Sequence, residues 1–152
     1  MQIIEGGVTA AKGFKAAGMA AGIKYKNGKK DMAMVVSDKP CVTAGTFTLN
    51  RVFAAPVKWD KNIVYNEAYA QAIVVNSGVA NACTGVEGDE ACALEAKTAG
   101  EALEFQPMQC FLVQQVLLEC SFLWIECVQE LRNFQNFLII LKRLEHLPQR
   151  QL

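Results

Sequence analysis

The sequence predicts a single α/β domain, and three patterns indicate this class. Two apolar runs of strand character, Met32–Ser37 and Ile73–Val75, are bounded by residues that favour turns. Small apolar residues at helical spacing follow Gly85. At 152 residues the chain is long enough for one hydrophobic core, and a second compact domain is not expected.

The charge and the cysteine content narrow the function classes. Fifteen basic and fifteen acidic side chains give a formal charge of zero, so nothing steers the protein towards nucleic acid or an anionic membrane. The first residues lack a basic region followed by an apolar one, which predicts a cytoplasmic protein without a secretory signal or transit peptide. The six cysteines form no CxxC pair and His146 is the only histidine, so we expect reduced, buried thiols and no metal site.

The first third of the chain is predicted to be rich in strands. Lys15–Ile23 has two glycines in nine residues, which favours a closely packed strand over a helix. Asn27-Gly28 is typical of a two-residue hairpin turn, because both turn positions need positive φ. Met32–Ser37 is predicted as a buried strand that ends at Asp38-Lys39-Pro40, and Val42–Thr48 as a third β-rich run.

A strand and a polar loop occupy the middle of the chain. Trp59–Tyr69 is predicted as a surface loop or short helix, and it leads to the stretch Ala72–Gly85. There an apolar run enters a loop of small, hydrogen-bonding residues. Such a loop at a strand end commonly binds ligands in α/β proteins, although an ordinary strand-to-helix turn has the same pattern. The candidate pocket residues are Asn76, Ser77, Gly78, Asn81 and Thr84.

A helix is predicted from about Gly88 to Glu104. Its apolar stripe is formed by small and aliphatic residues, and its charged residues are expected away from that stripe. Cys92 lies on the stripe and is expected to pack in the core instead of reacting. The stripe comprises Cys92, Ala96, Ala99 and Leu103, and the charged residues are Glu95, Lys97 and Glu101.

Several segments in order carry a family likeness. They resemble the amino-terminal part of the bifunctional ornithine acetyltransferase/N-acetylglutamate synthase family of arginine biosynthesis, over residues 1 to about 107. Ala11, Leu49 and Val79 depart from the residues usual in that family. The segments are G-G-V-T-A-A-K-G-F-K-A-A-G at Gly6–Gly18, V-S-D-K-P at Val36–Pro40, F-T-L-N-R-V at Phe47–Val52, A-A-P-V at Ala54–Val57 and V-V-N-S-G-V-A-N-A-C-T-G at Val74–Gly85.

The resemblance implies an enzyme of the N-terminal-nucleophile type, built from layered sheets and helices. The family precursor cuts itself before a threonine into α and β chains that stay together and oligomerise. The freed threonine moves an acetyl group from N-acetylornithine to glutamate, and acetyl-CoA is a second donor in bifunctional members; no other cofactor is implied. This chemistry needs an activated hydroxyl and an oxyanion hole. The resemblance places the loop after Ala72 beside the acetyl-transfer pocket.

The remainder, Met108–Leu152, does not resemble the family. It lacks the S-T-G-V-I-G oxyanion segment and the G-A-T nucleophile segment, and no Gly, Ala, Thr or Asp occurs after Ala102. Leu112–Glu126 can be written with permitted codons that, read from the third base, give S-T-T-G-V-I-G-V-Q-L-P-M-D-R. We therefore expect a frameshift between about Pro107 and Leu112, which divides the chain into an α-chain-like part, 1–107, and an out-of-frame part, 108–152, with no catalytic residue in either.

A natural tail is the alternative. Four large apolar residues recur at helical spacing in it, which predicts an amphipathic helix. The chain would then be a non-catalytic interaction module that binds a partner through this helix. These residues are Leu131, Phe134, Leu138 and Leu141.

Overall fold

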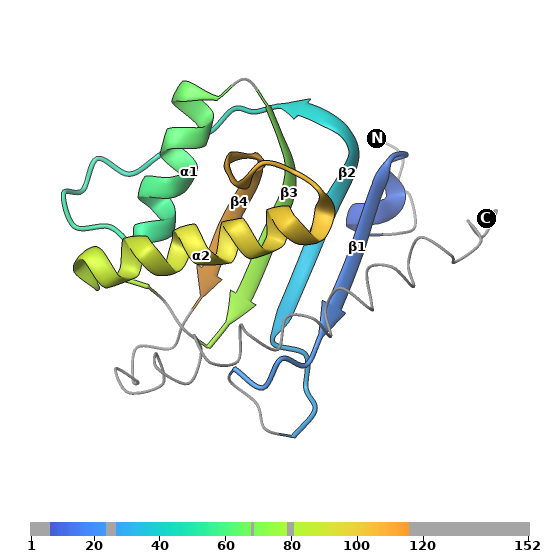
Figure 1. Cartoon of the computed structure of the whole chain (residues 1–152), viewed down its shortest axis with the longest axis horizontal. Helices are drawn as coiled ribbons and strands as arrows, with labels where there is room; N and C mark the ends of the chain where they lie inside the picture. The colour runs from blue at the N-terminus through green and yellow to red at the C-terminus, as the bar shows by residue number, and fades with distance from the viewer. Residues whose placement is uncertain (1–6, 24–26, 68, 79–80, 116–152) are drawn as a thin grey trace, which may run out of the picture.

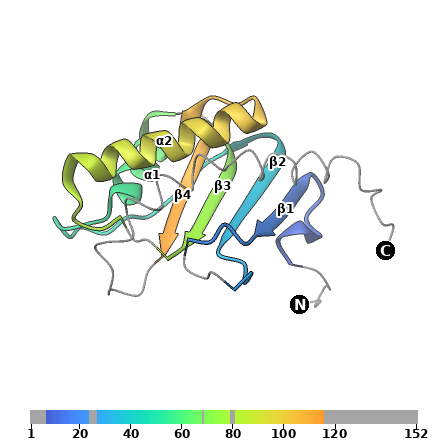
Figure 2. The ribbon, with the colours of Figure 1, turned by 60° about the horizontal axis from the view of Figure 1, so that its bottom comes forward.

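The computed structural model describes residues 7–23, 27–67, 69–78 and 81–115, and it shows two layers (Figure 1). Strands β1 to β4 form one sheet in the order β1-β2-β3-β4, in which β1/β2 and β2/β3 are antiparallel and β3/β4 are parallel. Helices α1 and α2 both cover the same face of the sheet (Figure 2). The predicted α/β class is confirmed. The elements are a 3-10 helix η1 (Val8–Ala10), β1 (Phe14–Met19), β2 (Met32–Val42), α1 (Ala55–Asn66), β3 (Tyr69–Ser77), α2 (Gly85–Leu103), a 3-10 helix η2 (Pro107–Gln109) and β4 (Cys110–Gln115).

The core lies between the sheet and the two helices. Ala17, Met34, Val74 and Leu112 are paired in register across the four strands, so their side chains share the face that the helices cover. Met34 and Val74 are fully buried and Leu112 nearly so. Burying a side chain of this kind contributes roughly 1.5–3 kcal/mol. This row is therefore a main source of the stability of the fold.

The opposite face of the sheet carries a second apolar row. Ala16, Val35, Ile73 and Phe111 are paired in register from β1 to β4. Neither α1 nor α2 packs on this side, and Ile73 remains 40% exposed. The alternation of side chains along a strand explains why one strand can place Val74 in the core and Ile73 outside it.

The connection between β1 and β2 is longer than predicted. The two strands pair as a hairpin, but residues 20–31 join them, so the two-residue turn at Asn27-Gly28 is wrong. The Asp31 carboxylate accepts a hydrogen bond from the Ala21 N–H at 2.6 Å, which holds the two ends of this longer loop together. Gly28 does adopt positive φ, 79°. The prediction correctly placed a positive φ at Gly28 but missed the hydrogen bond between Ala21 and Asp31.

The second half of β2 also differs from its prediction. The strand does not end at Asp38-Lys39-Pro40; it bulges there and pairs with β3 again at Cys41 and Val42. The Asp38 N–H donates to the Gly13 carbonyl at 2.8 Å and its carboxylate pairs with Lys15 at 3.1 Å, so the bulge is held by its neighbour β1. Pro40 is tolerated because a bulge does not need its missing N–H.

The predicted β-rich run Val42–Thr48 is wrong beyond its first residue. The Thr48 hydroxyl accepts the Asn50 N–H at 3.1 Å, and the Asn50 carboxamide accepts the Val52 N–H at 3.0 Å. Side chains that bond nearby main chain in this way compete with strand pairing. The segment therefore forms an open loop, in which Leu49 is 99% exposed.

The helix predicted after Gly85 forms, and the segment predicted as a surface loop or short helix is largely helical. Trp59–Tyr69, predicted as loop or short helix, belongs mostly to α1, whose first turn contains Pro56. The helix predicted over Gly88–Glu104 is α2, and Cys92, Ala96 and Ala99 are buried as expected. Glu95 was expected away from the stripe and is instead 2% exposed.

The proposed tail helix at Leu131–Leu141 lies outside the described residues. Within the part of the chain that is described, no helix is both long and apolar enough to cross a membrane.

Candidate functional site

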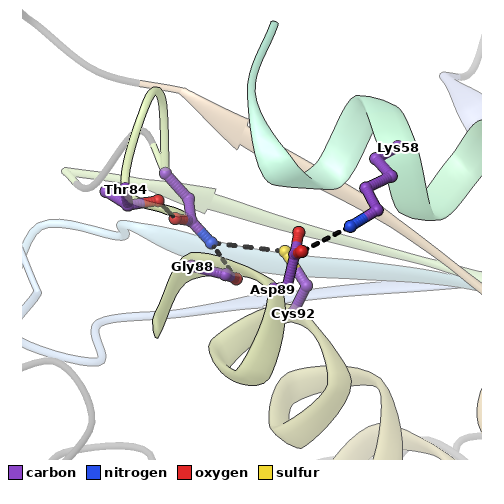
Figure 3. Close-up of polar contacts among 6 residues, drawn as sticks. Lys58, Thr84, Gly88, Asp89 and Cys92 are labelled. Atoms are coloured by element: carbon purple, nitrogen blue, oxygen red, sulfur yellow. Dashed lines mark hydrogen bonds and ion pairs between the residues drawn. The ribbon is translucent and has the colours of Figure 1, made fainter. Parts of the chain in front are cut away.

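The loop between β3 and α2 is fastened to the helix by Asn81. Asn81 is 1% exposed, and its carboxamide N–H groups donate to the Gly88 carbonyl at 2.6 Å and to Cys92 Sγ at 3.3 Å. Its carboxamide oxygen accepts a hydrogen bond from the Thr84 hydroxyl (Figure 3). Every hydrogen-bonding group of this amide is therefore occupied by the loop and the first turns of α2.

Gly88 allows this close packing. A Cβ at this position would overlap the Thr84 hydroxyl and the Asn81 carboxamide oxygen. Glycine in a helix is less favourable than alanine by about 1 kcal/mol, so its presence in α2 needs a packing reason. The reason is the bonded pair of Thr84 and Asn81 side chains, which occupies the space that a methyl group would fill.

The same loop is tied to α1. The Ala55 N–H, in the first turn of α1, donates to the Asn81 carbonyl at 2.9 Å, and Ala54 forms an isolated bridge with Ala82. The Lys58 ammonium of α1 forms an ion pair with Asp89 of α2 (Figure 3). The loop thus begins at the sheet and is held by both helices.

Asn76 occupies a different place from the other amide. It is 4% exposed on the helix side of β3, and its carboxamide N–H donates to Glu95 Oε1 at 3.4 Å. Its carboxamide oxygen has no hydrogen-bond partner among the described residues. Asn76 and Glu95 form a polar contact inside the layer between the sheet and α2.

Ser77 and Gly78 lie at the turn after β3, and both are partly exposed, as is Thr84. The Ser77 N–H donates to the Asp31 carbonyl at 2.8 Å, which fixes the end of β3 against the β1–β2 connection. Gly78 has φ 134°, a conformation that other residues rarely adopt. The structure therefore brings Asn81 and Thr84 together, places Asn76 under α2, and leaves Ser77 and Gly78 at the turn.

Two hollows lie elsewhere. One, of about 620 Å³, lies between α1 and α2, and the other, of about 250 Å³, lies on the uncovered face of the sheet. None of the five candidates lines either hollow. The first is lined chiefly by Lys58, Trp59, Asn62, Asp89, Cys92 and Met108, the second chiefly by Phe14, Val35, Cys41, Gln71, Ile73 and Phe111.

The titratable groups near the loop do not form a nucleophile. Burial raises the pKa of the Cys92 thiol to about 12, and the neighbouring Glu95 carboxylate adds to that rise. Burial likewise raises the pKa of the Cys110 thiol to about 11. Both thiols are protonated near neutral pH and are poor nucleophiles. In the described ranges, no three His, Cys, Asp or Glu side chains are grouped to hold a metal ion.

Three polar residues of the structure were missed by the sequence patterns. Glu95 stands at the i+3 position from Cys92 and next to Ala96, so helical spacing places it on the buried stripe. Trp59 and Asp60 of α1 bond the main chain of β4. No local pattern predicts these last two contacts, because they join residues more than fifty positions apart.

Comparison with known proteins identifies the family to which the sequence is similar. The sequence model of the ArgJ family matches residues 15–115. The arginine biosynthesis bifunctional protein ArgJ of Gloeobacter violaceus is 50% identical over 106 residues, which are 70% of this chain and 26% of that protein. The protein of the same name from Thermosynechococcus vestitus is 48% identical, over 70% of this chain and 25% of its own length. The chain thus spans about a quarter of these curated relatives.

Solved structures agree with the sequence match. The crystal structure of the arginine biosynthesis bifunctional protein of Bacillus halodurans superposes with a TM-score of 0.69 at 34% identity, over 76% of this chain and 59% of that one. The ornithine acetyltransferase of Mycobacterium tuberculosis, solved in complex with ornithine, superposes with a TM-score of 0.69 at 38% identity, over 75% of this chain and 61% of that one. Strands, helices and the fastened loop all lie within or beside the matched region, and this chain belongs to the ArgJ family.

Proposed function

We propose that this chain carries the amino-terminal part of an acetyltransferase of arginine biosynthesis, which moves an acetyl group from N-acetylornithine to glutamate and uses acetyl-CoA as a second donor. The observation that carries the proposal is the ArgJ match over residues 15–115, together with the likeness to an ornithine acetyltransferase solved with ornithine. The relatives' name supports the placement in arginine biosynthesis.

Within this proposal the loop after β3 is one wall of the acetyl-transfer pocket. Ser77 and Gly78 are its contact positions, because both are partly exposed at the turn. Asn81 and Thr84 shape the wall from behind, because their polar groups are already bonded to each other and to α2. Asn76 supports the strand end through Glu95.

The chain alone is proposed to be inactive. Acetyl transfer through a covalent intermediate needs an activated hydroxyl and donors for the oxyanion. In the described part of the chain the Thr84 hydroxyl is bonded to Asn81 and has no basic group to activate it, and Cys92 is held as a thiol. The proposal accordingly includes the frameshift between about Pro107 and Leu112, beyond which the residues that complete the site, and those that associate with a companion chain, would be encoded in another frame.

Two measurements test the proposal. Repeated sequencing of the DNA across the codons for Pro107–Leu112 should show a base change that, when corrected, restores the family frame; an uninterrupted frame in the native gene contradicts the frameshift. The purified chain should show no acetyl transfer from N-acetylornithine to glutamate, whereas the frame-corrected protein should be active. Turnover by the pure chain would disprove its inactivity, and an inactive but folded corrected protein would disprove the assigned reaction.

The role of the loop has its own test in the frame-corrected protein. Ser77→Ala should raise the KM for N-acetylornithine several-fold, the loss expected when one hydrogen bond to a ligand is removed. Asn66→Ala is the matched control, since Asn66 is exposed at the end of α1 and its side chain donates to the Asn62 carboxamide at 2.6 Å. Equal kinetics for the two variants would remove Ser77 from the pocket.

A further inference from the structure

The outer edge of β4 is occupied by side chains of α1. The Trp59 indole N–H donates to the Cys110 carbonyl at 3.0 Å, and the Asp60 carboxylate accepts the Leu112 N–H at 2.9 Å. β4 is the last strand of the described sheet and pairs only with β3 there. Two main-chain groups of this edge strand therefore have partners that do not come from a strand.

Trp59 and Asp60 bond the same two main-chain groups of β4 that a further parallel strand would bond. In a parallel pair, one residue donates its N–H to the carbonyl before the residue opposite it and accepts the N–H after that residue. For a strand opposite Phe111, those groups would be the Cys110 carbonyl and the Leu112 N–H. Trp59 and Asp60 provide the donor and the acceptor from two consecutive positions of α1.

We propose that Trp59 and Asp60 form a latch that closes the edge of the sheet at β4, holding this strand to α1 and occupying the groups that another strand would need. An open edge of this kind is a template for pairing with another chain. Both contacts are to main-chain atoms, so the latch acts whatever side chains β4 carries. This inference concerns the fold of the chain as it stands and does not depend on the proposed function.

The partly buried environment of the Asp60 carboxylate supports its role in the latch. Burial raises the pKa of the Asp60 carboxyl to about 6, and the Leu112 N–H partly opposes that rise. A carboxylate placed where it loses hydration is unfavourable unless it has a partner. Among the described residues, this carboxylate accepts its hydrogen bond from the Leu112 N–H on the edge of β4.

The test compares two buried cysteines in one molecule. Cys110 lies in β4 and is 0% exposed, and Cys92 lies in α2 and is 1% exposed. Opening of β4 alone exposes Cys110, whereas unfolding of the whole domain exposes both. The labelling rate of each thiol by a maleimide, measured by mass spectrometry of the separated peptides, distinguishes the two events.

Asp60→Ala should accelerate labelling of Cys110 on the order of ten-fold and leave Cys92 unchanged, since a hydrogen bond to a charged group is lost. Trp59→Phe, which keeps an aromatic ring and removes the donor, should have a smaller effect in the same direction. Asp60→Asn keeps the acceptor and should label no faster than the native chain. Asn62→Ala, two positions further along α1 on its exposed side, should label like the native chain.

Hydrogen exchange gives a second measurement. The Leu112 amide should exchange faster in Asp60→Ala, while amides in the middle of β3 keep their protection. Equal acceleration of Cys92 and Cys110 labelling in Asp60→Ala, or an unchanged Leu112 amide, would overturn the latch.

Discussion

At the scale of one residue, Asn81 shows that the hydrogen-bonding groups of a polar loop side chain can all be occupied within the fold. An asparagine in a small-residue loop after a strand suggests a ligand contact, and the sequence alone leaves that reading beside the simple turn. In the structure its amide is buried and bonded to Thr84, Gly88 and Cys92. The pattern identified a loop of small, hydrogen-bonding residues, and only the three-dimensional contacts show that the Asn81 amide is bonded within the fold.

Asn81→Ala should therefore destabilise the chain. The substitution removes a buried amide together with its hydrogen bonds to the Gly88 carbonyl, Cys92 and the Thr84 hydroxyl, so we expect a loss of about 2–3 kcal/mol in the free energy of unfolding. Urea unfolding followed by circular dichroism measures this change. Asn66→Ala, which removes an exposed amide pair, should change the free energy by no more than about 0.5 kcal/mol. A similar small change for Asn81→Ala would refute the fastening role.

Glu95 shows a second limit of prediction from the sequence. The same helical spacing that predicts burial of Cys92, Ala96 and Ala99 places Glu95 between them, but its charge favours the assignment to the outer face. A buried carboxylate needs a partner, and the structure supplies Asn76 from β3. Since that partner comes from another element, the sequence of α2 cannot predict it.

At the scale of the elements, prediction succeeded where apolar residues form one clear pattern. The apolar run Ile73–Val75 in β3 and the apolar stripe of α2 identified both elements within a few positions. The Val42–Thr48 run failed although its residues favour strands, because Thr48 and Asn50 bond their own neighbours. Likewise, the bulge that carries β2 past Pro40 depends on Gly13 and Lys15 in β1 and its approach. Strand propensity alone predicts neither set of contacts.

The contact between α1 and β4 makes stability depend on pH through Asp60. Burial raises its pKa to about 6 in the folded chain from an ordinary value of 3.8, so the folded state holds the proton more tightly. This contribution to stability is fully present below about pH 4 and is lost as the pH rises through about 6. Asp60→Asn should remove that loss and stabilise the chain at pH 7 by roughly 1–2 kcal/mol, a value discounted for partial exposure.

Urea unfolding of both chains at several pH values measures the effect. Other carboxylates contribute slopes of their own, so the informative quantity is the difference between Asp60→Asn and the native chain. It should grow between about pH 4 and pH 6 and stay constant above. A difference that does not change with pH would show that Asp60 keeps an ordinary pKa.

At the scale of the whole molecule, the two faces of the sheet have different roles. The face of Met34 and Val74 is covered by α1 and α2, and these side chains are fully buried. The face of Val35 and Ile73 has an equally continuous apolar row, and neither α1 nor α2 lies over it. Continuous apolar runs in β2 and β3 place apolar side chains on both faces of the sheet, because neighbours along a strand point to opposite faces. Which face the helices cover is decided by how the chain crosses over the sheet.

The uncovered face should make this chain associate with itself. Exposed contiguous apolar surface favours association, and Ile73 is 40% exposed beside Val35. The double variant Val35→Thr/Ile73→Thr keeps strand-favouring residues while adding two hydroxyl groups, so it should reduce association with little change in folding. Light scattering at matched concentrations measures the average mass.

Val74→Thr is the control on the covered face: its buried hydroxyl should lower stability by about 1–3 kcal/mol and increase association through partial unfolding. If the double variant remains as associated as the native chain while staying folded, the apolar row is not the cause, and the exposed loop around Leu49, which is 99% exposed, becomes the surface to alter next.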